Sequence, residues 1–278
     1  MRQFVVDAFA RAAFKGGPAC VVVPPFTSWP EDAWMQAMAM ENNQAETAFL
    51  RATASPDRFD LRWFSPTKEE PMCGHATLAA AHVLFNELGH AAESLTFDTL
   101  SGALTVRREN NGLVMDFPAR PPFDLPPMPE IEAAVVAGLG VTPVRLYGGP
   151  GLIAMLDSEA TVRGLRPNVG ALPFYPGSVF CERHVMVTAP ADPGAPYDAV
   201  SRFFPPDMGI EEDPATGSMH CMLALLYHRL TGRTAMRFYQ AHPRRGAEIH
   251  TELVDDRVML RGQAVTVAES VLRLELPA

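Results

Sequence analysis

The sequence predicts an α+β protein of two similar lobes, each a curved, mostly antiparallel sheet or barrel wrapped around a central apolar helix. Fourteen short strand-like runs separated by turn signals are distributed over the 278 residues. Two helices that are apolar nearly all round begin at Gly74 and Gly217, about half the chain length apart. Between them, residues 118–129 contain six prolines, a density typical of an extended linker.

The first lobe is predicted to consist of strands around one buried helix. Ser28 and Glu31 form a candidate capping box for an outer helix that ends at Met40. The next helix, 74–88, ends before Gly89 and has no polar face, so it must be buried. The expected strands are 5–9, 19–23, 45–50, 61–64, 95–99, 103–107 and 113–117, the last two joined by an Asn111-Gly112 turn.

The second lobe is predicted to repeat this order, from strands to a helix that begins at Gly217 and stops at Gly232. The expected strands are 152–156, 179–188, 200–204, 248–253, 257–260, 264–267 and 271–276. We therefore expect an N-terminal lobe of residues 1–117, completed by 264–278, and a C-terminal lobe of residues 118–263.

Composition narrows the classes of function. The net charge of −9 disfavours a sequence-independent nucleic-acid binder, which needs a basic surface. No apolar run reaches the length of a membrane span, and the first ten residues are predicted to form a strand, not a targeting segment. Scattered cysteines without a disulfide pattern favour a cytoplasmic protein with reduced thiols.

The starts of the two apolar helices are candidate anion-binding sites. A helix N-terminus presents free N–H groups and a partial positive charge, and glycine lets a ligand approach the backbone. Backbone amides of Gly74, His75, Gly217 and Ser218 could together hold a carboxylate if both helix starts faced one cleft. Tight turns alone would also explain the two glycines, and His75 could be an ordinary core histidine.

Two acidic residues are candidates for chemistry. Glu46 stands where an apolar strand enters the core, and burial there would favour the neutral carboxyl and suit it to carrying a proton. An exposed glutamate at a strand end is the alternative. Asp213 directly precedes Pro214 and lies within a turn or two of Ser218. We expect the two preceding residues, Glu211 and Glu212, to be solvated.

Metal and nucleotide sites are not predicted. The pairs Cys73-x-His75, Cys181-x-x-His184 and His220-Cys221 could each be half of a zinc site, but none has a partner at a matching spacing. The sequence also lacks the glycine-rich motifs of phosphate and dinucleotide sites, so no cofactor is expected.

Nearly the whole chain resembles the PhzF-like family, named for phenazine biosynthesis, which has the diaminopimelate-epimerase-like fold. The resemblance is carried by VVDAFA, GGPACVVV, ENNQAETAFL, LRWFSPTKEEPMCGHATLAAAHVL and GIEEDPATGSMHC. At position 17, where the family usually has asparagine, this chain has glycine.

The resemblance implies an isomerase with its active site between two lobes, and a homodimer. It places the proton-shuttling glutamate at Glu46, the histidine of the GHAT-type motif at His75, and the aspartate and serine of DPATGS at Asp213 and Ser218. The expected reaction needs no cofactor: a proton moves on a small cyclic or unsaturated carboxylic acid. Two alternatives stay open, a carboxylate-binding or interaction protein without turnover and a racemase or epimerase that uses Cys73.

Overall fold

The computed structural model describes residues 1–23, 26, 28–110, 112–176, 178 and 183–274. The chain folds into two compact units. Unit 1 comprises Met1–Phe117 with Leu260–Ala278, and unit 2 comprises Pro118–Met259. In the described ranges, no helix combines the length and the apolar character that crossing a bilayer requires.

Unit 1 is built on a sheet with the strand order β17, β1, β2, β3, β4, β6, β7, β8, in which only the β2–β3 and β4–β6 pairs are parallel. A short strand, β5, pairs with β4. The strands are β1 (Arg2–Ala8), β2 (Gly17–Val23), β3 (Glu46–Ala52), β4 (Arg58–Phe64), β5 (Glu69–Glu70), β6 (Ser94–Thr99), β7 (Gly102–Glu109), β8 (Gly112–Pro118) and β17 (Ala264–Val271).

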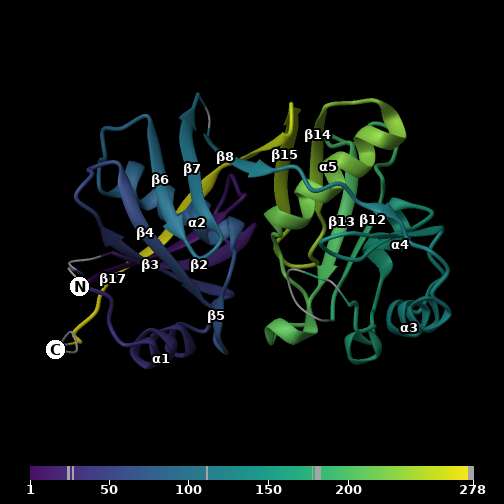
Figure 1. The fold of residues 1–278 in the computed structure, drawn as a ribbon, viewed down its shortest axis with the longest axis horizontal. Coiled ribbons are helices and arrows are strands. Elements are labelled where there is room, and N and C mark those ends of the chain that lie inside the picture. The colour runs from purple at the N-terminus through teal and green to yellow at the C-terminus, as the bar shows by residue number, and fades with distance from the viewer. Residues whose placement is uncertain (24–25, 27, 111, 177, 179–182, 275–278) are drawn as a thin grey trace. The chain divides into compact units, whose positions relative to one another are not determined.

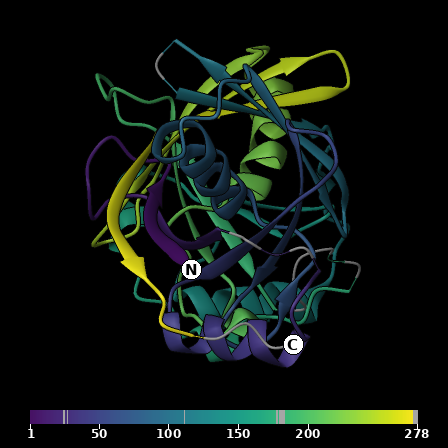
Figure 2. The ribbon, with the colours of Figure 1, turned by 90° about the vertical axis from the view of Figure 1, so that its left-hand side faces the viewer.

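Helix α2 (Gly74–His82) is the buried centre of unit 1. All nine of its residues are buried, and it packs against β1, β2, β3 and β17 (Figures 1 and 2). A π-helical turn, η1 (Val83–Glu87), continues it to Leu88. This agrees with the apolar run in the sequence, because a helix without a polar face is stable only when other elements cover all its sides.

Helix α1 (Asp32–Asn42) covers the opposite face of the sheet of unit 1. Its Met35 and Met38 pack on Phe49 of β3 and Phe64 of β4. The predicted capping box is wrong: Glu31 takes the N-cap position and no side chain caps the helix. The alternation of β3 follows from this arrangement, since Phe49 faces α1 while its neighbours Ala48 and Leu50 face the other way.

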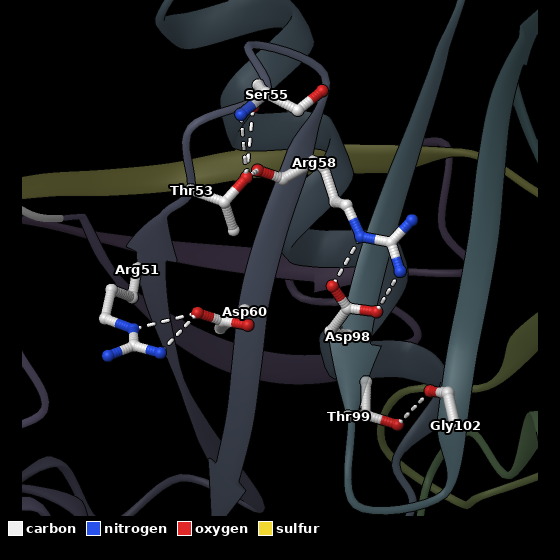
Figure 3. Close-up of polar contacts among 8 residues, drawn as sticks. All are labelled: Arg51, Thr53, Ser55, Arg58, Asp60, Asp98, Thr99 and Gly102. Carbon is white, nitrogen blue, oxygen red and sulfur yellow. Dashed lines mark hydrogen bonds and ion pairs between the residues drawn. The ribbon is translucent and has the colours of Figure 1, made fainter.

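Charged pairs on β3, β4 and β6 fit the register of these strands (Figure 3). Asp60 lies opposite Asp98 in the parallel β4–β6 pair, an arrangement of like charges that is unfavourable alone. Arg51 Nε donates to Asp60 at 2.8 Å, and Arg58 binds Asp98 through two bonds of 2.6 Å. Each aspartate is therefore neutralised by an arginine, which makes the register compatible with its charges.

Within unit 2 the strands pair in the order β9, β10, β11, β12, β13, β14, β15, with parallel pairs at β11–β12 and β13–β14. Its strands are β9 (Phe123–Asp124), β10 (Arg145–Gly148), β11 (Ile153–Met155), β12 (Val185–Pro190), β13 (Ala199–Phe204), β14 (Ala235–Gln240) and β15 (Ala247–Val254). The strand β16 (Arg257–Gly262) then leads the chain back into unit 1.

The helices of unit 2 pack on its sheet. Helix α5 packs against β14 and β15, and α4 packs against β12 and β13. Helix α3 contributes Ile131 and Val135 to an apolar cluster with Val185 and Val187 of β12. The helices are α3 (Pro129–Leu139), α4 (Glu159–Gly164) and α5 (Gly217–Thr231), and the short 3₁₀ turns are η2 (Val169–Ala171) and η3 (Pro206–Met208).

Several predicted elements of the second half need correction. The proline-rich stretch is not purely a linker, because it contains β9 and its last proline begins α3. The predicted strand 179–188 begins only at Val185, and its residues 179–182 lie outside the described part, as does Asn111 of the predicted turn. The last strand ends at Val271, so none follows over the described residues 272–274.

Candidate functional site

Glu46 and His75 meet inside unit 1. Glu46 is the first residue of β3, His75 is the second residue of α2, and each residue is 3% exposed. The Oε2 atom of Glu46 lies 2.7 Å from the Nε2 atom of His75. The structure thus brings together two of the side chains that the sequence singled out, from elements that are 29 residues apart in the chain.

The contact between these two atoms is close but not aligned as a hydrogen bond. Both Glu46 Oε2 and His75 Nε2 are buried and lack a hydrogen-bond partner within the described ranges. Buried polar atoms without partners are rare in folded proteins, and each calls for an explanation such as a bound ligand or water. The pair is therefore positioned to bind a ligand or a water molecule that supplies the missing hydrogen bonds.

The electrostatic surroundings favour a charged His75. Burial alone would lower the pKa of the imidazole, but its interactions with Cys73 and Glu46 outweigh this effect, and the pKa of His75 lies well above 6.5. Burial raises the pKa of the Cys73 thiol to about 12. That thiol is therefore neutral near pH 7, and the Glu46 carboxyl is the acidic group that lies 2.7 Å from the Nε2 atom of the ring.

Glu46, Cys73 and His75 are also a possible metal-ligand set, because their ligand atoms lie within 4.8 Å of one another. Cys73 Sγ lies 3.7 Å from His75 Nδ1, on the side of the ring away from the Nε2 atom that faces Glu46. Ligand oxygen and nitrogen atoms on a tetrahedral ion lie about 3.3 Å apart, so the 2.7 Å contact between Glu46 and His75 would have to open before an ion could bind both. The geometry fits proton transfer better than metal binding.

The start of α2 lies beside this pair and has the features from which the sequence predicted an anion-binding site. Cys73 is the N-cap residue, and Gly74 and His75 are the first two helical residues. Their N–H groups have no partner within the helix and carry the positive end of its dipole. The first turn has no acidic side chain that would neutralise this charge. A carboxylate bound there would lie next to Glu46 and His75.

In unit 2, Asp213 holds the loop that leads into α5. Its Oδ1 accepts a hydrogen bond of 3.1 Å from the Ala215 amide, and its Oδ2 accepts one of 2.5 Å from the Thr216 hydroxyl. Gln240 binds the backbone on both sides of this turn, at Asp213 O and the Thr216 amide. Both carboxylate oxygens of Asp213 thus shape the start of α5, and its catalytic role stays a prediction.

Gly217 and Ser218 are the first two residues of α5. Gly217 is buried and Ser218 is partly exposed. Thr216, fixed by Asp213, takes the N-cap position. The start of α5 resembles that of α2 in having glycine first and no acidic residue in the first turn.

The family model for phenazine biosynthesis-like proteins matches residues 6–270. The chain belongs to this family. An uncharacterized isomerase of Pseudomonas aeruginosa is 42% identical over 270 residues, with 97% of each chain covered. The mouse phenazine biosynthesis-like domain-containing protein 1 is 40% identical over 288 residues, covering 97% of this chain and 98% of the mouse protein.

Solved structures agree with this family assignment. A PhzF-family phenazine biosynthesis protein of Enterococcus faecalis has a TM-score of 0.87 and 38% identity, covering 98% of this chain and 99% of that one. A probable proline racemase of Agrobacterium radiobacter shares the fold, with a TM-score of 0.64 at 14% identity over 99% and 93% of the two chains. The predictions of an isomerase and of a mixed α and β fold are confirmed at this level.

The sequence analysis of this family member missed a buried ion pair next to the Asp213 loop. Arg202 of β13 is 3% exposed and binds Glu212 through two hydrogen bonds of 2.8 and 2.7 Å. Its remaining nitrogen donates to the carbonyl oxygens of Val162 and Leu165. The expectation that Glu212 is solvated was therefore wrong. Arg202 within the apolar run 199–204 was the available signal, because a buried arginine needs a partner.

His220 shows why a histidine near a helix start need not be part of a site. Its Nδ1 lies 2.8 Å from Thr216 O and its Nε2 lies 2.9 Å from the Ser201 hydroxyl, so both ring nitrogens are bonded. Of the other two Cys-His pairs, Cys181 lies outside the described residues, and Cys221 is bonded to Gly217 O.

His220 is expected to make the protein less stable in mild acid. Burial lowers the pKa of His220 from 6.5 to about 4. Between these two pH values the imidazole is protonated in the unfolded chain but neutral in the folded one. The contribution of His220 to the free energy of unfolding is fully present above pH 6.5. It falls by about 3 kcal/mol at most as the pH drops from 6.5 towards 4. Urea unfolding across this range should show the loss, and His220→Gln should flatten it. The exposed His228→Gln is the control, and an unchanged slope for His220→Gln would contradict the assignment.

Proposed function

We propose that the chain is a cofactor-independent isomerase that moves a proton on a small cyclic or unsaturated carboxylic acid, with Glu46 as general acid and base. The contact of 2.7 Å between Glu46 and His75, buried and without aligned hydrogen bonds, is the observation that carries the proposal. Membership of a family with relatives named isomerases supports the reaction class.

In the proposed reaction, Glu46 removes a proton from a carbon next to the substrate carboxylate or conjugated with it. The C–H electron pair moves into the conjugated system, and Glu46 then returns a proton to another carbon. The proton that Glu46 carries can exchange with solvent before it is returned. No electrons are gained or lost overall, so no redox cofactor takes part. The imidazole of His75, 2.7 Å from the Glu46 carboxyl, orients this carboxyl for the proton transfer.

The helix start of α2 is proposed to hold the substrate carboxylate. Negative charge grows on the carboxylate when the proton leaves, and the amides of Gly74 and His75 with the helix dipole stabilise it. We infer a similar anion-binding role for Gly217 and Ser218 at the start of α5 and a positioning role for Asp213.

A cysteine-based racemase is the weaker alternative. The raised pKa of Cys73 leaves its thiol protonated at neutral pH, so it is a poor base. A racemase also needs a second base on the opposite face of the reacting carbon. The fold shared with the proline racemase carries no assignment of activity, because folds host many reactions.

Deuterium exchange tests turnover directly. The wild-type chain in heavy water, incubated with a panel of small cyclic and aromatic or unsaturated carboxylic acids, is expected to place deuterium at carbon in at least one of them. Mass spectrometry measures the incorporation, and Cys73→Ala should retain it. Binding of an acid without exchange in the whole panel would favour a binding protein, and exchange that disappears in Cys73→Ala would favour the cysteine-based reaction.

A further inference from the structure

Unpartnered polar atoms are concentrated in one part of unit 1. Five buried side-chain nitrogen or oxygen atoms lack a hydrogen-bond partner in the described part of the chain. Four of them are Glu46 Oε2, His75 Nε2, Trp63 Nε1 and Glu70 Oε1, and only Thr251 lies in unit 2. The residues Trp63 and Glu70 have no part in the proposed proton transfer, yet they are 1% and 3% exposed.

The strand register places Trp63 and Glu70 on the same face as Glu46. Ala48 of β3 pairs with Trp63 of β4, which pairs with Glu70 of β5. Cross-strand partners project from the same face with Cβ atoms about 5 Å apart. Glu46 shares this face because it is two residues from Ala48 along β3. The face is turned away from α1, since Phe49 and Phe64 occupy the other one.

Two adjacent glutamates on β5 differ in their surroundings. Glu69 is bound by Arg62 through hydrogen bonds of 2.7 and 2.6 Å. Glu70 has the Lys68 ammonium at 3.6 Å from its Oε2, whereas its Oε1 has no hydrogen-bond partner among the described residues. Burial raises the pKa of the Glu70 carboxyl; Lys68 and Ser65 act in the opposite direction, and the charge of Glu46 adds to the increase. Lys68 therefore partners one oxygen of this buried carboxyl, whereas no described residue gives the other oxygen, Oε1, the hydrogen bond that would offset its burial.

We propose that Trp63 and Glu70 form a second polar anchor of the Glu46–His75 site and bind a hydroxyl group of the substrate. An indole N–H can only donate, and a carboxyl oxygen such as Glu70 Oε1 can accept. A hydroxyl satisfies both, accepting from Trp63 and donating to Glu70, whereas a carbonyl or an ammonium group satisfies one. This inference rests on the proposed function, and it narrows the substrate class to hydroxylated carboxylic acids.

Benzoate and its 2-, 3- and 4-hydroxy derivatives are suitable probes, because they differ only in the hydroxyl group. Calorimetric titration of the full chain should show the best hydroxybenzoate binding about 5- to 10-fold more tightly than benzoate, as expected for one or two net hydrogen bonds. Trp63→Phe and Glu70→Leu should each remove most of this preference and leave the affinity for benzoate within about 3-fold. The matched control, Glu69→Gln, should keep the preference.

Thermal unfolding without ligand supplies a second measurement. Glu70→Leu is expected to raise Tm by a few degrees, because it removes a buried carboxyl oxygen without a partner. A residue with a merely structural role would instead lower Tm on replacement. Gain of stability together with loss of the hydroxyl preference is the signature of a binding residue.

Equal affinity for all four benzoates in the wild type, or a failure of all four to bind, would overturn the anchor, as would a preference that survives both variants. An ordered water between Trp63 and Glu70 would produce the first of these results.

The proposed function is tested separately from the anchor. If no deuterium exchange occurs, the proposal of an isomerase is wrong even where the hydroxyl preference holds. If exchange depends on Glu46 but no hydroxyl preference is found, only the anchor is wrong.

Discussion

Replacing Glu46 with glutamine is expected to lower the rate of deuterium exchange by ~10²–10⁴-fold, the usual contribution of a general acid or base. The amide has nearly the shape of the carboxyl but cannot take up or return a proton at neutral pH. Since the amides at the start of α2 are unchanged, the affinity for a carboxylate ligand should stay within a few-fold.

The measurement is the initial rate of deuterium incorporation by wild type and Glu46→Gln, with affinity determined by calorimetry on the same samples. Glu69→Gln is the matched control, because Glu69 belongs to the same unit but binds Arg62. Exchange in Glu46→Gln close to the wild-type rate would show that another group carries the proton.

Replacing Glu212 with leucine is expected to destabilise unit 2 by about 3–5 kcal/mol, the usual effect of removing one partner of a buried ion pair. Arg202 is 3% exposed and would keep its hydrogen bonds with Val162 O and Leu165 O and its contact with the Phe204 ring, but would lose the carboxylate of Glu212. Its charge would then be buried without a counter-ion. The same loss should loosen the loop that carries Asp213, because Glu212 directly precedes it.

The positions of the tryptophans allow this effect to be assigned to one unit. All three, Trp29, Trp34 and Trp63, belong to unit 1, so their fluorescence reports on its unfolding, whereas circular dichroism reports on both units. In urea, Glu212→Leu should shift the dichroism transition more than the fluorescence transition. The neighbouring exposed residue gives the control Glu211→Leu, and the double variant with Arg202→Met should recover most of the loss. Equal stability of the two single variants would contradict the role of the ion pair.

The elements that could be predicted from the sequence are those with a strong local pattern. The run from Gly74 to Leu88 has no polar face, and it forms a buried helix with a π-helical end. Proline misled the prediction at Pro129, because proline is unfavourable inside a helix but favourable in its first turn, where α3 has it. The strand β5 has only two residues, too few to show a periodicity, whereas β14 alternates between outward and buried residues and was not predicted despite this signal.

The residues of the candidate site could be predicted only where a local pattern marks them. Glu46 and His75 could be selected because each stands at the start of an apolar element, but their distance depends on how β3 packs on α2. Glu70 could not be selected, because two adjacent glutamates in a polar stretch look alike until pairing with β4 turns one of them inward. Arg202 and Glu212 likewise find each other only through the fold of unit 2.

The pairing of β1 with β17 has a consequence for synthesis on the ribosome. Unit 2 is a continuous segment, whereas unit 1 needs residues from both ends of the described chain, with Arg2 opposite Val271. The nascent strand β1 must wait for about 260 further residues before its second neighbour emerges, some tens of seconds at a usual rate of translation. During that interval β1 exposes an unpaired edge, the part of a nascent chain where chaperones are most needed.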